Sequence, residues 1–358
     1  MIQINMNEKT VSPNVKSIRV DGLCAIEGTN FRGLEAVRKN RQITEAYKGV
    51  LTDEKVRDIV GKYGLPKKVE RDYPGFCDEN YLNAFVTDYL SDGYLYDWDN
   101  YRIPTRIYPI SETVIGELEE ASGEQISLYY ARGWKTFIEV LQYAMIMASV
   151  LILSGISVLF AEEGQTGMKQ LIFTTKEGIQ KDIAAKTAAA FTLTVCIYFG
   201  AVVLDLVMCA AVFGLDGLSC PLGITMNQQL SLDRNVPHPE ACMQTGSFIG
   251  ILLIVSLLAI LVLCAVTLCV SAHFHSCFHA VMVSSACWGM PVMIRIFFGR
   301  FAYALMAGTP VFLIFYNNTL ELLLFQILRV ISLTFAITLL VVGIVCGYRG
   351  YKRNRFIF

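Results

Sequence analysis

The chain has 358 residues, of which 54% are hydrophobic and only 17% are charged. Soluble domains carry about 25% charged residues, so the composition excludes a simple soluble enzyme. The formal net charge of −1 excludes a strong general attraction to nucleic acid. Residues 1–139 hold 18 Lys/Arg and 22 Asp/Glu, whereas residues 140–358 hold 12 and 9. We therefore predict a water-facing domain followed by a membrane-embedded one.

The N-terminal part, residues 1–139, is predicted to be mostly α-helical. Apolar residues recur at helical spacing within 31–48 and 78–91. Thr52 can cap a helix that ends at Gly64. A short acidic helix begins near Ser111. This pattern favours a small helical domain without a site of its own, because its loops show no arrangement of catalytic residue types.

Five long runs with at most one charge each follow. Each is close to or above the roughly 20 residues that a spanning helix needs. They are residues 140–161, 187–215, 247–272, 276–294 and 330–348.

A sixth uncharged run, residues 301–320, contains Gly308 and Pro310. It either spans the membrane or enters and leaves on one side as two short helices buried in protein. The Lys/Arg-rich tail after Tyr348 is placed in the cytoplasm. Five spans then put residues 1–139 outside and six put them inside. The distribution of Lys and Arg favours six slightly and leaves both alternatives open.

The segment between the first two runs, residues 162–186, has a distinctive pattern. It opens with the paired carboxylates Glu162 and Glu163, and Gly167 and Gly178 bracket an amphipathic stretch. Apolar residues at spacings of 3, 4 and 7 share one helix face; they are Met168, Leu171, Ile172, Ile179 and Ile183. Lysines occupy other positions, namely 169, 176, 181 and 186. The segment is either an ordinary connector or a helix that lies along the membrane and docks a partner protein.

This stretch resembles the signature that follows the second span in ABC transporter permeases of the type-2 exporter (ABC-2) class. Those proteins show F-x-x-E-x-x-x-G, then a hydrophobic stretch, a basic residue and a closing lysine. The matching residues are Phe160, Glu163, Gly167, Leu171, Lys176 and Lys186. The sequences GLDGLSCPL (214–222) and GLEAVRKNRQITEAYKGVLTDEKV (33–56), and the pair Gly133–Trp134, also resemble a large bacterial subgroup. The resemblance covers roughly residues 30–350.

The resemblance implies an all-α polytopic membrane protein. Family members have six spans, cytoplasmic termini and a re-entrant element before the last span. Mapped here, 140–161 is the second span, 1–139 is an outward, mostly helical domain and 301–324 is the re-entrant element. The first span of the family is then missing: the chain is a fragment, its start is wrongly assigned, or it is a variant that lacks that helix. We predict that an apolar stretch of about 20 residues is encoded upstream. The chain itself carries a bundle of five spans.

The resemblance also implies a function. The chain would be the multi-pass permease subunit of an exporter in the cell membrane, paired with a second permease subunit, identical or sister. An ABC ATPase subunit would dock on residues 162–186 and bind ATP and Mg²⁺, because no G-x-x-x-x-G-K-[ST] loop occurs here. The chain itself is thus expected to be no enzyme and to hold no cofactor or metal. The predicted coupling residues are Phe160, Glu162, Glu163, Gly167, Met168, Leu171, Ile172, Lys176, Ile179 and Lys186.

Three smaller features leave alternatives open. Asp205 lies within a predicted span and is either a structural polar contact or part of a substrate path. The cluster His273, His275, Cys277 and His279 is interpreted as an interfacial turn rather than a metal site, because no carboxylate accompanies it.

Two cysteine pairs could form disulfides if their segments lie outside the cell, although nothing in the sequence requires it. They are Cys24 with Cys77 and Cys220 with Cys242.

The alternative function is a membrane sensor or structural protein whose outward domain binds a ligand. A sensor needs a cytoplasmic effector, and only ten residues follow Tyr348. A membrane-embedded enzyme is disfavoured because the spans hold no constellation of carboxylate, histidine and serine.

Overall fold

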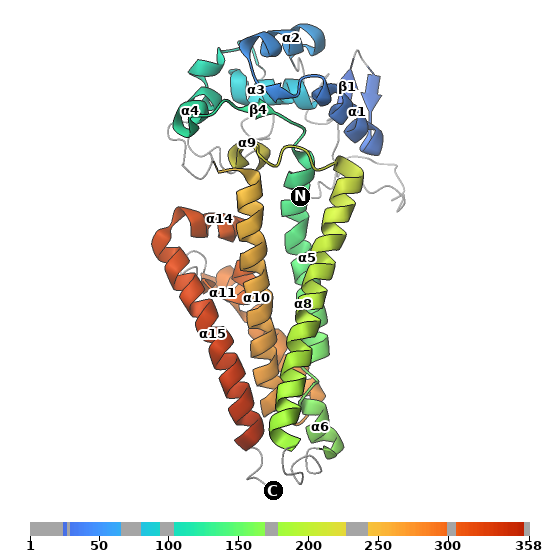
Figure 1. The fold of residues 1–358 in the computed structure, drawn as a ribbon, viewed down its shortest axis with the longest axis vertical. Coiled ribbons are helices and arrows are strands. Elements are labelled where there is room, and N and C mark those ends of the chain that lie inside the picture. Colours follow the sequence, from blue (N-terminus) through green and yellow to red (C-terminus); the bar gives the residue numbers. More distant parts are fainter. Residues whose placement is uncertain are drawn as a thin grey trace. The chain divides into compact units, whose positions relative to one another are not determined.

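The computed structural model describes residues 24–26, 29–65, 80–93, 104–168, 178–226, 243–298 and 306–353. The chain divides into two compact units (Figure 1). The first comprises Met1–Thr136 and Met208–Phe248, and the second comprises Phe137–Val207 and Ile249–Phe358. Helices predominate in the described residues of both units.

The first unit contains short helices and two small antiparallel hairpins in its described part. The helices are α1 (Gly33–Glu45), α2 (Asp53–Tyr63), α3 (Tyr81–Leu90), η1 (Ile110–Glu112), α4 (Val114–Ser122) and α9 (Leu222–Met226). The hairpins pair β1 (Cys24–Ile26) with β2 (Thr29–Phe31), and β3 (Gly49–Val50) with β4 (Ser127–Leu128). The sequence did not predict these hairpins, because strands of two or three residues are too short to show an alternating pattern.

Local capping explains where the helices of this unit begin and end. The Thr52 side chain accepts a hydrogen bond from the Lys55 N–H, and Gly64 ends α2 with φ at 70°. Both were predicted from the sequence. Asn80 caps α3 through a capping box with Asn83, which was not predicted. Each cap satisfies N–H groups that the first helical turn leaves unpaired.

A tyrosine-rich core holds the first unit together. Tyr130 and Phe213 are buried beside Val37. The Tyr81 ring packs on the Tyr130 ring with centroids 4.9 Å apart, and its hydroxyl donates to the Tyr129 carbonyl at 3.1 Å. Phe213 therefore joins a core formed otherwise by residues before position 136.

Five long helices match the five predicted spans, and each is long and apolar enough to cross a membrane. They are α5 (Arg132–Ile156), α8 (Gly178–Phe213), α10 (Thr245–His273), α11 (Cys277–Phe298) and α15 (Gln326–Arg353). Even α11, with 22 residues, extends about 33 Å, which exceeds the roughly 30 Å hydrocarbon core. Several helices continue beyond the apolar runs through Lys, Arg and Gln, which are good helix formers.

The described part of the sixth apolar run is not one continuous helix. It forms α13 (Pro310–Ile314) and α14 (Tyr316–Leu324), with Pro310 in the first turn and Thr309 as N-cap. Gly308 has a φ of 86°, and a Cβ on it would lie 2.4 Å from the Ser332 carbonyl oxygen. A straight spanning helix over residues 306–324 is therefore excluded, and this finding favours the five-span alternative.

Small residues and polar side chains bring the helices of the second unit together. Gly343 and Gly347 of α15 form a G-x-x-x-G pair against α10, where a Cβ on Gly343 would lie 2.9 Å from the Ala265 backbone. The Tyr198 hydroxyl of α8 donates to the Leu253 carbonyl of α10 at 2.6 Å. These contacts make α10 the helix on which both α8 and α15 pack.

Candidate functional site: an acid–lysine–tyrosine cluster

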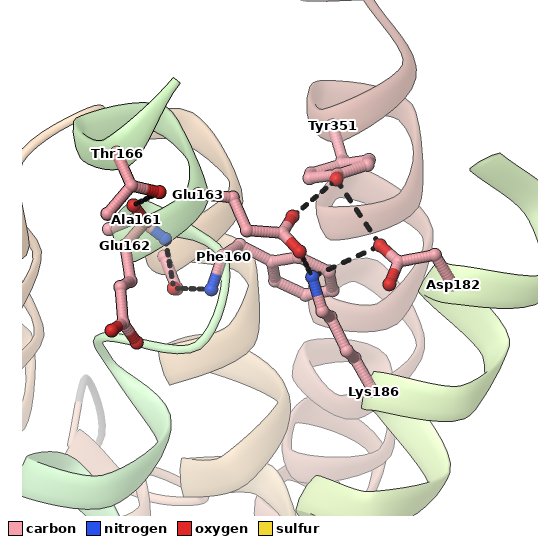
Figure 2. A network of polar contacts seen from close by, with 9 residues as sticks. Phe160, Ala161, Glu162, Glu163, Thr166, Asp182, Lys186 and Tyr351 are labelled. Carbon is pink, nitrogen blue, oxygen red and sulfur yellow. Dashed lines mark hydrogen bonds and ion pairs between the residues drawn. The ribbon is translucent and has the colours of Figure 1, made fainter. Parts of the chain in front are cut away.

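Four polar side chains from three helices meet at one place in the second unit (Figure 2). Glu163 belongs to α6 (Ala161–Thr166), the short helix that follows α5. Asp182 and Lys186 stand four residues apart on α8, a spacing that puts them on the same helix face. Tyr351 comes from the last turns of α15. We call Glu163, Asp182, Lys186 and Tyr351 the acid–lysine–tyrosine cluster.

The cluster is connected by ion pairs and charge-assisted hydrogen bonds. The Lys186 ammonium pairs with the Glu163 carboxylate and lies 3.1 Å from Asp182 Oδ2. The Tyr351 hydroxyl donates to Glu163 Oε2 at 2.6 Å and to Asp182 Oδ2 at 3.3 Å. Hydrogen bonds to ionised groups are shorter and stronger than neutral ones. Each carboxylate is therefore held by both the lysine and the tyrosine.

Aromatic rings shield the lysine from water. The Phe160 and Tyr351 rings pack with centroids 4.9 Å apart, and the Lys186 ammonium lies 5.4 Å and 5.9 Å from the two centroids. These distances are typical of cation–π contacts. The charged side chains are only 16–22% exposed, and Tyr351 is fully buried. The pairs therefore lose less to solvent screening than surface pairs do.

Two formal negative charges face one positive charge in the cluster. Lys186 therefore neutralises only one carboxylate, and the Tyr351 O–H supplies the further donor that a partly buried pair of carboxylates requires. Removing the lysine would leave two neighbouring carboxylates in a poorly hydrated place. The four side chains come from α6, α8 and α15. The cluster therefore keeps its ion pairs and hydrogen bonds only while these three helices stay in their present positions.

Helix α6 is held at its start by α10 and near its end by the first residue of α11. The Ser271 hydroxyl accepts from the backbone N–H groups of Phe160 and Ala161, at 3.0 Å and 3.3 Å. The Gln165 side chain accepts from the Cys277 N–H at 3.3 Å. These bonds fix the backbone that presents Glu163 to the cluster.

The structure brings together three of the predicted coupling residues, Phe160, Glu163 and Lys186. Glu162 is exposed, and its carboxylate points away from the cluster (Figure 2). Gly167 ends α6 with φ at 73°, and Met168 is 54% exposed. Residues 171, 172 and 176 lie outside the described residues, as does the side chain of 179. The predicted docking face therefore stays a prediction, although its last member, Ile183, is buried.

Sequence reasoning missed Asp182, Ser271 and Tyr351. Asp182 had a local signal, since it pairs with Lys186 at helical spacing. Tyr351 is 188 residues from Glu163 in the sequence, and no local pattern pointed to it. Only the packing of α15 on α10 brings it to the cluster.

The remaining candidates lie elsewhere. Asp205 is 6% exposed within α8. The His273 Nδ1–H donates a hydrogen bond to the Cys269 carbonyl at 2.7 Å, and the ring packs against Gly350. Among the described residues, no group of three His, Cys, Asp or Glu side chains is placed to hold a metal ion.

Cys220 is a buried free thiol, 3.8 Å from the Ser127 carbonyl, and burial raises its pKa to about 12. Its predicted disulfide partner, Cys242, lies outside the described residues, as do Cys77 and the side chain of Cys24. A thiol with so high a pKa is a poor nucleophile at neutral pH.

Searches against protein-family models, curated proteins and solved structures found no match to this chain.

Proposed function

We propose that this chain is the permease subunit of an ATP-driven exporter of the ABC-2 class. Two arguments support the proposal: the five spanning helices, and the resemblance of residues 160–186 to the coupling segment of that class. In this proposal the chain sits in the cell membrane beside a second permease subunit. The residues 1–139 face outward, residues 301–324 form the re-entrant element, and ATP and Mg²⁺ bind to a separate ATPase.

The acid–lysine–tyrosine cluster is the observation that carries the proposal. Glu163 stands at one end of residues 162–186, whereas Asp182 and Lys186 stand at the other. Tyr351, near the end of α15, donates a hydrogen bond to Glu163 and so connects that helix to the same cluster. The two ends of the segment are thus joined to each other and to the last spanning helix. A partner that pushed on the segment would move these helices together rather than deform a loop.

The cluster would transmit such a push because its bonds are short and directional. If α6 moved, Glu163 would move with it. The bonds from Glu163 to Lys186 and Tyr351 would then shift α8 and α15 as rigid bodies. Each ion pair or hydrogen bond of this kind is either formed or broken. Such a contact could therefore be formed in one state of an alternating transporter and broken in the other. Asp182 would keep Lys186 paired while Glu163 changes partners.

The apolar face of the segment would supply the docking energy. Burying one Leu or Ile side chain contributes roughly 1.5–3 kcal/mol. Removing two of them should weaken ATPase binding by at least about a hundredfold, at 1.4 kcal/mol per tenfold change.

Co-purification tests the function directly. We expect an ATPase with a P-loop sequence to co-purify with the tagged chain from detergent-solubilised membranes. We expect Leu171→Ala combined with Ile172→Ala to abolish co-purification while the chain stays folded and inserted. Gln180→Ala is the control, because this exposed side chain of the same segment is not part of the predicted apolar face. Unchanged ATPase affinity in the double variant would show that the segment is an ordinary connector.

A further inference from the structure

Helix α1 belongs to a basic segment that is followed by an acidic one. Residues 31–48 hold five Lys/Arg and two Asp/Glu, whereas residues 49–139 hold ten Lys/Arg and 17 Asp/Glu. An anionic surface attracts a basic segment and repels an acidic one. Within residues 31–139, charge therefore favours α1 for contact with an anionic partner.

Helix α1 packs on the end of a predicted span. Val37 is buried against Phe213, the last residue of α8. The Arg41 guanidinium lies against the Gly214 backbone, where an added Cβ would be 2.6 Å from Arg41 Cζ, and it pairs with Asp216 at 3.2 Å. All of these residues belong to the first unit. Helix α1 thus lies at the level where the apolar part of α8 ends.

This level corresponds to the headgroup layer of a membrane. The apolar run of α8 ends at residue 215, and the headgroup layer is roughly 5–8 Å thick on each side of the hydrocarbon core. A helix with its side chains is about 10 Å across, so a helix that touches the last residue of a span reaches into this layer. Tyr81 and Tyr130 pack in the same place, and tyrosine is enriched at membrane–water interfaces.

The side of α1 that includes Arg41 is exposed. Leu34, Arg38 and Arg41 stand four and three residues apart, a spacing that puts them on one helix face. Leu34 is 50% exposed, Arg38 is exposed as well, and no ion pair joins Arg38 to another described residue. The Asn40 side chain accepts from the Tyr81 N–H at 2.9 Å, so a different side of α1 packs on α3. The exposed face is therefore turned toward the end of α8.

Two arginines beside an exposed leucine match the chemistry of an anionic phospholipid. Arginine carries five N–H donors and binds phosphate oxygens with several of them, and Asp216 accepts from one nitrogen of Arg41. A helix that carries basic and apolar side chains together at the membrane surface binds anionic lipid. A soluble anion or an acidic protein surface would use the arginines but would offer no acyl chains to Leu34.

We propose that α1 binds phospholipids with anionic headgroups. Arg38 and Arg41 bind the headgroup phosphate, and Leu34 inserts among the upper parts of the acyl chains. This binding holds the first unit against the membrane surface. It does not depend on the proposed exporter function.

Native mass spectrometry of the full chain, released from detergent micelles, tests the proposal. The chain is titrated with dioleoylphosphatidylglycerol, which is anionic, and with dioleoylphosphatidylcholine, which has the same acyl chains but no net charge. Each Arg near an anionic surface contributes about a fivefold gain in affinity. We therefore expect the anionic lipid to bind at least about tenfold more tightly than the neutral one.

Charge variants identify the residues that bind. Arg38→Gln combined with Arg41→Gln should weaken binding of the anionic lipid at least about tenfold. Arg57→Gln combined with Lys62→Gln is the matched control, because it removes the same charge from exposed positions on α2 and should bind as the parent does. Arg38→Gln alone, which breaks no ion pair with a described residue, should lose about fivefold, and Arg38→Lys should restore most of the affinity.

Photo-crosslinking locates the bound lipid. A phosphatidylglycerol with a diazirine on its headgroup should label the peptide that contains residues 33–45 in the parent chain. Labelling of this peptide should fall in the Arg38/Arg41 double variant and persist in the α2 control.

Four results would overturn the proposal. They are equal affinity for the two lipids, parental affinity in the double variant, absence of labelling in residues 33–45, and displacement of the lipid by an equal concentration of glycerol 1-phosphate. The last result would identify a site for soluble phosphate compounds. None of these measurements needs an ATPase, so their failure would leave the docking of an ATPase on residues 162–186 untouched.

Discussion

Two ion pairs of the same chemistry differ sharply in their surroundings. In the first unit, Arg41 pairs with Asp216 at 3.2 Å, and their side chains are 48% and 30% exposed. In the second unit, Lys186 pairs with Glu163 and Asp182, and all three side chains are only 16–22% exposed. The Phe160 ring lies beside the Lys186 ammonium. Exposed pairs contribute little to stability, whereas breaking a desolvated one leaves an uncompensated charge. Burial and the number of helices joined, rather than charge, therefore distinguish the acid–lysine–tyrosine cluster from a surface contact.

Loss of the lysine should have the largest effect. Lys186→Met keeps the aliphatic length but leaves Glu163 and Asp182 facing each other without a cation. We expect the free energy of unfolding in detergent to fall by up to about 3 kcal/mol, the lower end of the range for breaking a buried pair. Lys181→Met, at an exposed position on the same helix, should change it by less than about 1 kcal/mol. Equal effects of the two variants would remove the distinction between buried and exposed charges.

Loss of the Tyr351 hydroxyl should cause the second-largest loss of stability. Tyr351→Phe keeps the ring that packs on Phe160 but removes the donor to both carboxylates. Hydrogen bonds to charged groups contribute about 1.5–3 kcal/mol, and a thermal-unfolding series in detergent should show a loss of this size. Tyr348→Phe, half-exposed one turn earlier on α15, is the control and should unfold as the parent does. A parent-like Tyr351→Phe would mean that the hydroxyl bonds are dispensable.

Loss of the surface ion pair between Arg41 and Asp216 should lower the stability least. We expect Arg41→Met to lower the free energy of unfolding by less than about 1 kcal/mol, and added salt to abolish most of that difference. A loss as large as that of Lys186→Met, or one insensitive to salt, would contradict this prediction.

Acid should weaken one loop of the first unit. The Asp92 carboxylate accepts hydrogen bonds from the backbone N–H groups of Thr105 and Arg106 and from the Thr105 hydroxyl, which hold its pKa well below the usual range. A depressed pKa stabilises the folded form above the unfolded value, about 3.9. That stabilisation is lost as the pH falls below it toward the folded pKa.

Hydrogen exchange measures this loop. The Thr105 and Arg106 amides, protected at pH 5, should lose protection relative to other amides of the unit as the pH falls toward 2. Asp92→Asn should exchange rapidly at both pH values. Protection that persists in the variant would show that the carboxylate is not what holds the loop.

The sequence predicted well what local patterns determine. The five spans follow from uninterrupted apolar runs, and the Thr52 cap and Gly64 stop follow from the preferences of single residues. The contact between Glu163 and Lys186 was not predicted as such, although both residues were singled out because residues 160–186 resemble a signature of ABC-2 permeases.

The rest depends on tertiary packing. Tyr351 joins the cluster only because Gly343 and Gly347 let α15 approach α10 closely. The sequence alone gave no partner for a tyrosine near the end of a span. The break between α13 and α14 was foreseen only as an alternative, because Gly308 and Pro310 are compatible with either course of the chain.

Removal of one carboxylate tests the coupling claim most directly. Glu163→Gln should leave Lys186 paired with Asp182, so the chain stays folded and binds its ATPase with unchanged affinity. Because the link to α8 and α15 is weakened, the effect of the chain on the ATP hydrolysis rate of its reconstituted complex with the proposed ATPase should fall at least about tenfold. In complex with the proposed ATPase, the neighbouring Glu162→Gln, which is exposed and outside the cluster, should support the same ATP hydrolysis rate as the parent chain. If Glu163→Gln retains the full parental effect, the cluster only stabilises the helices and its role in coupling is wrong.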